Sequence, residues 1–365
     1  MNKEKKKVLF TNLMIKEDTC DSFCKYCYHR DETKSTDTYA YDCKLKINID
    51  KAVKFATTYF NSPIIKICGG EIFLMSNLEE FVVELLKHFS YVLIQTNGRH
   101  LNDQNLKWII ALKRVMLQVS LDGHDLEMNA YRFEKAEIME NILYAIEKLK
   151  ANDVYIELTC VLNNKNTKRF DEYVKYMREL PGGRARNTLK ITPILIIDKE
   201  NLFKPCKEDL KAIDGIIKDY EKYADVLPPK KYMEMLNKVM HGETIKYQCF
   251  NPIVSLNMVN DGRVKSCTNV LPENVLNIGN MFEDDPEVIL KRYGDTKFQK
   301  LLLYTKQWVP ICKNCFNFCS IYNLYLNDTI SLDELCNNNY MFNIPEVRQR
   351  LLELHDMIDE AKIRV

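Results

Sequence analysis

Short apolar runs alternate with amphipathic stretches over the first two hundred residues of the chain. The amphipathic stretches repeat apolar residues at helical spacing and are Ile49–Phe60, Leu78–Phe89, Lys135–Lys150 and Phe170–Leu180. The apolar runs have the length of strands and are Val8–Ile15, Ile64–Cys68, Tyr91–Gln95, Val115–Ser120, Val154–Val161 and Leu189–Ile196. Strands interleaved with helices predict parallel βα units, so we expect an α/β fold.

Polar residues recur on one face of three of these expected strands. Successive side chains of a strand point to opposite faces, so residues two positions apart lie together. The pairs are Gln95 with Asn97, Gln118 with Ser120, and Glu157 with Thr159. A purely structural barrel fills its interior with branched apolar residues. We therefore expect a polar lumen that binds a polar ligand, the alternative being that these faces meet solvent.

The last part of the chain has a different pattern. Leu202–Met240 predicts a helical connector that Pro228 and Pro229 break into two helices. Ile253–Lys265 then alternates across an Asn-Asp-Gly turn at residues 260–262, which predicts a β-hairpin. We expect a barrel domain over 1–200, the connector over 201–245, and an α+β domain with a C-terminal helix over 246–365.

The composition excludes some classes of binding partner and indicates the cellular compartment. A net charge of +1 predicts neither a nucleic acid nor a membrane surface as the main partner. No apolar stretch approaches the roughly 20 residues that span a bilayer, and the amino terminus lacks the apolar core of a signal peptide. The sequence therefore predicts a cytoplasmic protein, in which 13 cysteines serve metal ligation rather than disulfides.

Three cysteines follow the first expected strand at the spacing C-x3-C-x2-C. They are Cys20, Cys24 and Cys27, within one short loop. Soft thiolates select iron–sulfur clusters or zinc, and a closed site normally needs four ligands. Three thiolates therefore predict a [4Fe–4S] cluster with one iron left open for another ligand. The alternatives are a zinc knuckle or incidental thiols.

This motif, with the aromatic Tyr26 just before its last cysteine, resembles the radical S-adenosylmethionine (SAM) superfamily. The resemblance implies a partial (β/α)6 barrel with reactive groups at the carboxyl ends of its strands. It implies that the open iron chelates SAM and that an electron from the cluster cleaves SAM to a 5′-deoxyadenosyl radical. By the same resemblance, the residues that contact SAM are Tyr26, Gly69, Gly70, Glu71, Asn97, Ser120 and Arg132. Glu71 would bind the methionyl amine and Arg132 the carboxylate, which guanidinium groups bind bidentately.

A second set of cysteines lies near the carboxyl terminus and is similar to the SPASM/twitch extension of that superfamily. The set is Cys249, Cys267, Cys312, Cys315, Cys319 and Cys336. The resemblance implies one or two auxiliary [4Fe–4S] clusters and leaves three partitions open. The last four cysteines ligate one cluster, or the first four share one cluster, or two clusters take three thiolates each. A zinc ribbon is the structural alternative, and Cys43, Cys68, Cys160 and Cys206 are expected to be structural.

SPASM-type enzymes mostly modify peptides or proteins. We therefore expect a maturase that modifies a ribosomally synthesised precursor peptide, by a crosslink, a thioether or an epimerisation. Flavodoxin or ferredoxin would be its electron donor. One alternative is a sulfatase-maturase-like protein oxidase, in which an aspartate base follows the hairpin cysteine; here Thr268 follows Cys267. The others are a small-molecule radical SAM dehydrogenase and a non-catalytic iron–sulfur carrier or sensor, which would need neither Glu71 nor Arg132.

Overall fold

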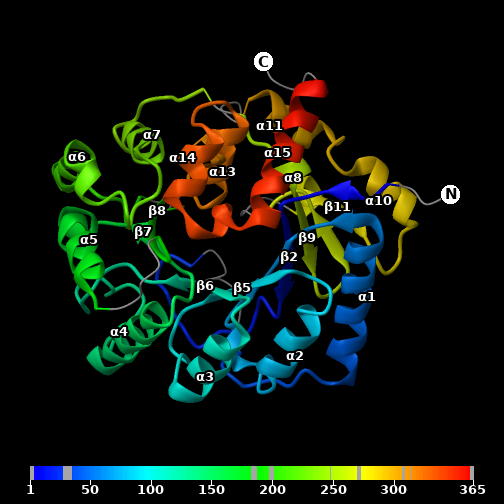
Figure 1. Cartoon of the computed structure of the whole chain (residues 1–365), viewed down its shortest axis with the longest axis horizontal. Coiled ribbons are helices and arrows are strands. Elements are labelled where there is room, and N and C mark those ends of the chain that lie inside the picture. The colour runs from blue at the N-terminus through cyan, green and yellow to red at the C-terminus, as the bar shows by residue number, and fades with distance from the viewer. Residues whose placement is uncertain are drawn as a thin grey trace.

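A computed structural model describes residues 4–27, 35–181, 187–196, 201–246, 248–268, 273–305, 309–313 and 315–361 of the chain. Within these residues, nine strands form one sheet in the order β11-β10-β9-β2-β4-β5-β6-β7-β8. Six neighbouring strands are parallel and form a curved half-barrel (Figure 1). They are β2 (Phe10–Ile15), β4 (Ile64–Gly69), β5 (Tyr91–Thr96), β6 (Val115–Ser120), β7 (Ile156–Leu162) and β8 (Leu189–Leu195).

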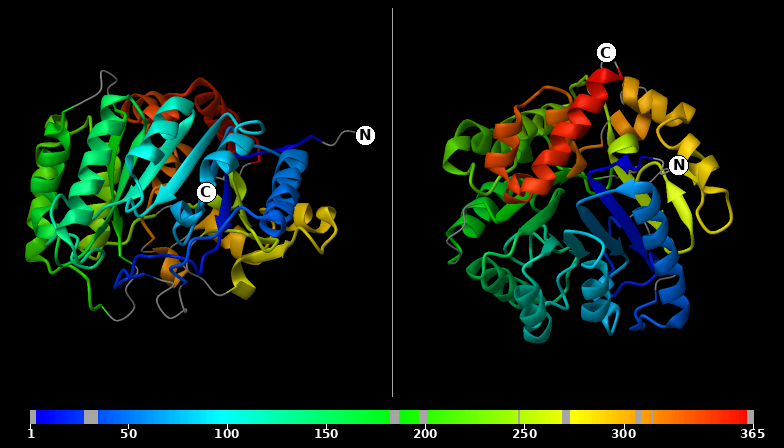
Figure 2. Two further views of the ribbon diagram at one scale, coloured as in Figure 1. Left: turned by 90° about the horizontal axis from the view of Figure 1, so that it is seen from below. Right: turned by 45° about the vertical axis from the view of Figure 1, so that its right-hand side comes forward.

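Each parallel strand but the last is followed by a helix on the outer side of the sheet (Figure 2). These helices are α1 (Cys43–Tyr59), α2 (Leu78–Leu85), α3 (Asp103–Leu112), α4 (Ala136–Ala151) and α5 (Phe170–Glu179). The alternation confirms the α/β fold expected from the apolar runs. Two helices differ from the expectation, because α1 begins six residues before Ile49 and α3 was not foreseen.

Strand side chains divide between an apolar outer face and a polar inner face. In β4, Ile65 and Ile67 are fully buried in the hydrophobic core. Lys66 and Cys68, which alternate with them, line an interior cavity instead. Burying the outer face stabilises the sheet by about 25 cal/mol for each Å² of apolar surface removed from water. The inner face is therefore available for chemistry.

The C-terminal part of the chain extends the same sheet. The strand β9 (Ser255–Val259) pairs in parallel with β2, and β10 (Arg263–Lys265) returns antiparallel to β9. This pair confirms the hairpin expected around the Asn-Asp-Gly turn, and β11 (Asn277–Asn280) completes the edge. Helices surround it, namely α8 (Asn251–Val254), α9 (Glu273–Leu276), α10 (Pro286–Arg292), α11 (Lys297–Tyr304) and α12 (Pro310–Lys313). The domain boundary at residue 246 stays a prediction.

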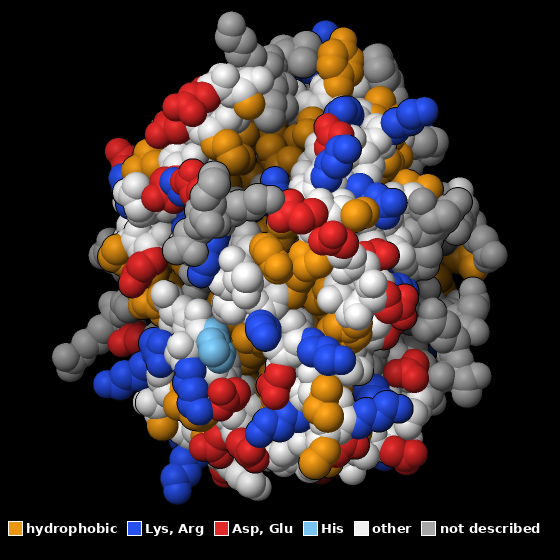
Figure 3. Space-filling model, turned by 90° about the vertical axis from the view of Figure 1, so that its right-hand side faces the viewer, with side chains coloured by type: hydrophobic (Ala, Val, Ile, Leu, Met, Phe, Trp, Pro, Cys, Tyr) orange, Lys and Arg blue, Asp and Glu red, His pale blue; other side chains and the backbone are white. Residues whose placement is uncertain are grey.

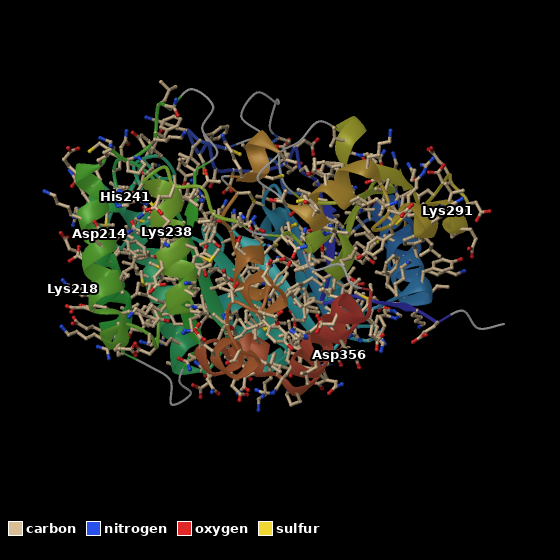
Figure 4. All side chains as sticks on the ribbon, turned by 90° about the horizontal axis from the view of Figure 1, so that it is seen from above. Asp214, Lys218, Lys238, His241, Lys291 and Asp356 are labelled. Carbon is tan, nitrogen blue, oxygen red and sulfur yellow. The ribbon has the colours of Figure 1, made fainter. Side chains whose placement is uncertain are left out.

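The expected helical connector contains α6 (Lys211–Lys218) and α7 (Lys230–Met240). Pro229 caps the start of α7, as the Pro-Pro pair predicted. Asp214 holds the two helices together, since it accepts a hydrogen bond from Asn237 Nδ2 at 2.7 Å and lies 3.6 Å from His241 Nε2. Figure 4 shows Asp214 and His241 at the outer end of the molecule, so this contact is structural.

A C-terminal segment bridges the two ends of the half-barrel. It carries α13 (Cys319–Leu326), α14 (Leu332–Asn338) and α15 (Pro345–Glu360). Just before α13, the Phe316 carbonyl accepts a hydrogen bond from Leu195 N of β8 at 3.2 Å, while the Phe318 ring lies 5.7 Å from Phe10 of β2. We call residues 315–326 the plug, because they contact both β8 and β2.

The surface carries charges of both signs. Over the face drawn in Figure 3, lysine and arginine side chains are interspersed with aspartate and glutamate. This mixture agrees with the near-zero net charge of the sequence. None of the helices in the described parts of the chain combines the length and the apolar character needed to cross a membrane.

Candidate functional site

The three cysteines of the N-terminal motif lie on the loop that follows β2, at the carboxyl edge of the parallel strands. Cys20, Cys24 and Cys27 all line one cavity of about 330 Å³. The backbone N–H of Ser22 points at Cys20 Sγ across 3.4 Å, and Arg132 Nη1 lies 3.7 Å from Cys24 Sγ. Hydrogen-bond donors and a positive charge thus face sulfur atoms that would carry negative charge as thiolates.

Two glycines allow the cysteine loop to pack on the end of β4. The Gly70 amide donates to Lys16 O at 3.2 Å, and the next amide donates to Thr19 O at 2.8 Å. A Cβ atom at Gly70 would stand 1.8 Å from Thr19 O, and one at Gly69 would stand 1.8 Å from Ile15 O. Both glycines also line the cavity. A side chain at either position would therefore collide with the protein backbone, whether or not a ligand is bound.

Glu71 lies beneath this contact and is hydrogen-bonded by three protein donors. Its carboxylate accepts hydrogen bonds from Phe73 N at 3.0 Å, Thr96 Oγ1 at 2.7 Å and Asn97 N at 2.6 Å. The side chain is buried and is absent from the cavity lining. Burial raises the pKa of this carboxyl, although the three donors act against the shift. In this structure Glu71 braces the strand ends, and its contact with SAM stays a prediction.

Asn97 connects the end of β5 to the cysteine loop. Its Nδ2 donates to Asp21 Oδ1 and to Ser22 Oγ, both at 2.9 Å. Asp21 also lies 2.9 Å from His100 Nε2. Burial alone would raise the pKa of Asp21, but the hydrogen bonds from His100 and Asn97 outweigh it and lower this pKa. The loop is thus fixed at its centre as well as at its start.

Asp122 organises the opposite side of the cavity mouth. It is completely buried and accepts hydrogen bonds from Tyr26 OH and, at 2.9 Å, from Val161 N. Arg132 Nε lies 3.3 Å from Asp122 Oδ1, and its guanidinium stands 5.4 Å from the centre of the Tyr26 ring. Tyr26, Ser120 and Arg132 line the cavity. Sequence reasoning missed Asp122, although it lies two residues after Ser120 in the same strand end.

The lumen below the mouth is polar, as the alternating strand residues predicted. Gln95, Gln118 and Thr159 line it together with Lys66, which sequence reasoning also missed. Lys66 Nζ donates to Gln118 Oε1 at 2.5 Å. The side-chain oxygen of Gln118 thus gives the buried end of Lys66 a polar partner in place of water.

Glu157 lies deeper on the same face of β7 as Thr159. It is completely buried, and no hydrogen bond of good geometry reaches either carboxylate oxygen within the described residues. Burial raises its pKa to about 7, while the nearby Thr192, Lys66 and Gln118 act against this rise. A carboxyl group with this pKa exchanges its proton near neutral pH.

Five of the six C-terminal cysteines surround the plug. Cys249 packs with Cys312 in a small apolar cluster. Asn251 Nδ2 lies 3.8 Å from Cys267 Sγ, and Asn317 Nδ2 lies 3.5 Å from Cys315 Sγ. Cys319, on α13, lines the lumen. The phenol of Tyr322 donates to Asn251 Oδ1 at 2.8 Å, and burial raises its pKa well above the ordinary value, with Cys319, Cys249 and Cys267 adding to the shift.

Cys336 has different surroundings. It lies in α14, and its buried thiol donates to Phe342 O at 3.1 Å. Burial raises its pKa, whereas the charge of Arg348 lowers it and that of Asp333 raises it. None of these neighbours is one of the other candidate cysteines. The structure therefore places Cys336 in a helical packing environment and the other five cysteines at the plug.

The side chains present are of the kind that the sequence implied, because three soft thiols on one loop suit an iron–sulfur cluster. Among the described residues, no three Cys, His, Asp or Glu side chains stand close enough together to hold a metal ion in this structure. The cavity of about 330 Å³, lined by polar and apolar side chains, is of the size that holds small-molecule cofactors. The individual roles of these residues stay predictions.

The fold is a partial parallel barrel that carries a cysteine loop after its first strand and a polar lumen below that loop. These features define a class of α/β barrels that bind metal clusters. The sequence profile of the radical SAM superfamily matches residues 14–177. The matched residues include the cysteine loop and end within α5.

Two curated relatives come from Bacillus subtilis (strain 168). The antilisterial bacteriocin subtilosin biosynthesis protein AlbA is 23% identical over 170 residues, which are 46% of this chain and 36% of that protein. The sporulation killing factor maturation protein SkfB is 26% identical over 111 residues, which are 30% of this chain and 27% of that protein. The match thus spans about a third or less of the length of either relative.

Solved structures share the fold over most of the chain. The structure of anSMEcpe with AdoMet and a Kp18Cys peptide has a TM-score of 0.59 and 18% identity, and it covers 96% of this chain and 100% of that chain. The structure of Streptococcus suis SuiB bound to S-adenosylmethionine has a TM-score of 0.57 and 14% identity, and it covers 85% of this chain and 73% of that chain. The likeness extends past residue 200, so the fold of the C-terminal part is shared as well.

Gly70→Ala tests the packing of the cysteine loop. The added methyl would collide with the Thr19 carbonyl, a backbone atom that cannot turn aside, so the loop must shift. We expect a lower melting temperature, a loss of stability of about 1–3 kcal/mol, and loss of the iron bound at the N-terminal cysteines. Gly215→Ala in α6 is the control, because no atom lies within 4 Å of its added Cβ. Equal iron content in the two variants would contradict this account.

Glu157→Gln tests the buried carboxyl. The folded-state pKa of about 7 lies above the unfolded value of 4.5, so wild-type stability is full below pH 4.5 and falls as pH rises through 7. Gln does not titrate, so the variant should gain stability relative to wild type from about pH 5 to about pH 8.5, by about 3 kcal/mol. Melting temperatures measured across this range check it, with the exposed Glu179→Gln as control. A stability difference that does not vary with pH would refute the shift.

Proposed function

We propose that this protein is a radical SAM maturase that modifies a ribosomally synthesised peptide. The observation that carries the proposal is the convergence of Cys20, Cys24 and Cys27 with Arg132 on a cavity that continues into a polar lumen. AlbA and SkfB, which share sequence with part of this chain, are named for bacteriocin biosynthesis and for maturation of a killing factor. SuiB, which shares the fold, has been solved with the precursor peptide SuiA.

In this proposal the three N-terminal cysteines hold a [4Fe–4S] cluster whose open iron binds SAM. When bound, the cluster and SAM supply the 5′-deoxyadenosyl radical that abstracts a hydrogen atom from an unactivated carbon. The cavity residues position SAM: Arg132 binds its carboxylate, Tyr26 lies against its adenine, and Gly69, Gly70, Asn97 and Ser120 shape the pocket. Glu71 binds the methionyl amine with acceptor capacity that its three protein donors leave over. A flavodoxin or ferredoxin donates the electron.

For the auxiliary cluster we favour the partition in which Cys249, Cys267, Cys312 and Cys315 are the ligands. Cys249 packs with Cys312. The charges of Cys249 and Cys267 both raise the pKa of Tyr322. The alternative partition needs Cys336, whose thiol is engaged with Phe342 O.

The protein-oxidase alternative is less well supported by the cavity. Thr268, the residue that follows Cys267, lines the cavity with a hydroxyl group. A threonine hydroxyl does not ionise near neutral pH and cannot replace a carboxylate base. If the cavity needs a base, another residue must provide it.

Replacing Cys20, Cys24 and Cys27 together with Ala tests the proposed activity. The variant should lose about four irons per chain and form no 5′-deoxyadenosine from SAM and dithionite, because the cluster that reduces SAM has no ligands. Iron analysis and chromatography of 5′-deoxyadenosine measure these losses. A Cys43→Ala/Cys206→Ala variant is the control, since both cysteines are exposed and lie outside the cavity. Undiminished 5′-deoxyadenosine formation by the triple variant would rule out the proposed activity.

The auxiliary partition is tested in the background that lacks the N-terminal cysteines. Cys312→Ala should remove all or most of the remaining iron, because it removes a ligand at the plug. Cys336→Ala should leave that iron in place, because its thiol packs within the outer helices. Iron and zinc analysis after anaerobic reconstitution decides between the two sets of cluster ligands. Iron loss from Cys336→Ala equal to that from Cys312→Ala would favour the other partition, and one equivalent of zinc without iron would indicate a zinc ribbon.

A further inference from the structure

A group of buried polar atoms in the lumen has no role in holding the fold. Among the described residues, no hydrogen bond of ordinary geometry reaches the carboxylate oxygens of Glu157 or the hydroxyls of Thr159 and Thr192. Thr192 and Gln118 are the side chains nearest to hydrogen bonding with Glu157, and both lower its pKa. Glu157 and Thr159 lie on one face of β7, and the strand register places Thr192 of β8 directly beside Thr159. Leaving buried polar groups unpaired costs about 1–3 kcal/mol each. Three such side chains together therefore point to a function or to bound molecules.

These side chains connect the cavity to the buried carboxyl. Thr159 lines the cavity together with Lys66 and Gln118, while Glu157 lies one step below, outside the lining. A threonine hydroxyl can accept a proton on one lone pair and release its own, so it can pass a proton between two groups that do not touch. Thr159 is placed to begin this transfer, because it adjoins the cavity. Thr192 is placed to complete it, because it lies beside Thr159 in the strand register and is a hydrogen-bonding neighbour of Glu157.

Four titratable groups face Glu157 from the elements around it. Lys66 approaches from β4, and its positive charge stabilises the carboxylate. Tyr155 precedes Glu157 on the chain, Tyr232 approaches from α7 and Cys319 from α13, and Glu157 raises the pKa of all three. Lys190, next to Glu157 in the strand register, is turned away, since its Nζ donates to the carbonyls of residues 224, 225 and 227.

The proposed function creates a need for a proton acceptor in this lumen. Joining a carbon to a second substrate atom breaks a C–H bond and an X–H bond and forms one C–X bond. One hydrogen leaves as an atom to the 5′-deoxyadenosyl radical. The other leaves as a proton, and the remaining electron passes to an iron–sulfur acceptor, so that atoms and charge balance. Thr268 cannot hold that proton, for the reason given above.

We propose that Glu157 is the proton acceptor of the lumen and that the hydroxyls of Thr159 and Thr192 pass the proton to it from the substrate. This inference rests on the proposed peptide-modifying function. The charge of Lys66 favours the ionised form of the carboxyl, and Gln118 holds Lys66 in position through its side-chain oxygen. The burial that raises the pKa of Glu157 to about 7 makes the carboxylate basic enough to take up a proton near neutral pH.

Infrared spectroscopy of the reconstituted protein tests the proton path without any substrate. Wild type should show a protonated carboxyl band that titrates with a midpoint near pH 7. This band should shift in D₂O within seconds (roughly the dead time of manual mixing), because Thr159 links Glu157 to the cavity. Glu157→Gln should lack this band, and Thr159→Val should retain it but slow its exchange at least about tenfold. A band absent from wild type, or an exchange rate that Thr159→Val does not change, would overturn the proposal.

Turnover of a peptide substrate tests whether Glu157 accepts the proton, with short peptides encoded near the gene as the probes. Glu157→Gln should form 5′-deoxyadenosine within about twofold of wild type but at least about tenfold less modified peptide per 5′-deoxyadenosine, because hydrogen abstraction precedes proton loss. The ratio in wild type should fall as pH drops below 7, and Glu157→Asp should restore part of it. Glu179→Gln, exposed on α5, is the matched control and should behave as wild type.

The outcomes separate the two proposals. No 5′-deoxyadenosine and no modified peptide from wild type would refute the proposed function, and the infrared result would then stand alone as a property of the lumen. Modified peptide from wild type and an unchanged ratio in Glu157→Gln would leave the function in place and refute the role of Glu157.

Discussion

The contact between the backbone of the cysteine loop and the end of β4 is the constraint on which the rest of the site depends. Parallel pairing of β2 with β4 places Ile15 beside Gly69, and the chain then turns so that the Thr19 carbonyl lies over Gly70. Only a residue without a Cβ fits at either position. Because this contact fixes where the loop begins, it also fixes where Cys20 and the two cysteines that follow it can stand. The hydrogen bonds of Asn97 then hold the centre of the same loop.

The buried polar groups of this structure are of two kinds, those that form hydrogen bonds within the fold and those that do not. Lys190 is buried and its pKa is lowered to about 7 by burial, yet its three donors all meet carbonyl oxygens. Glu71 and Asp122 are likewise buried among donors. Glu157 has the same burial, but among the described residues no hydrogen bond of ordinary geometry reaches its carboxylate oxygens. In a medium where an unpaired polar group is costly, this difference is the physical reason to assign Glu157 a role outside folding.

The sequence predicted those parts of the fold and site that depend on local pattern. Periodicity located the six parallel strands and the hairpin, and cysteine spacing located the loop, because both signals lie within a few residues. Asp122 was missed because its partners, Tyr26 and Arg132, meet it only after the strands pair. Lys66 was missed because one lysine in an apolar run also suits a side chain that reaches solvent. The parallel pairing of β9 with β2 joins residues about 245 apart in the chain, which no local pattern encodes.

The plug couples the chemistry of the lumen to the C-terminal cysteines. It contacts β8 and β2, and it also carries Cys315 and Cys319. Tyr322, in α13, lines the lumen and donates a hydrogen bond to Asn251, whose amide lies 3.8 Å from Cys267 Sγ. One short segment of the chain therefore supplies part of the lumen wall and contacts the surroundings of the C-terminal cysteines, so a substitution in the plug would alter both.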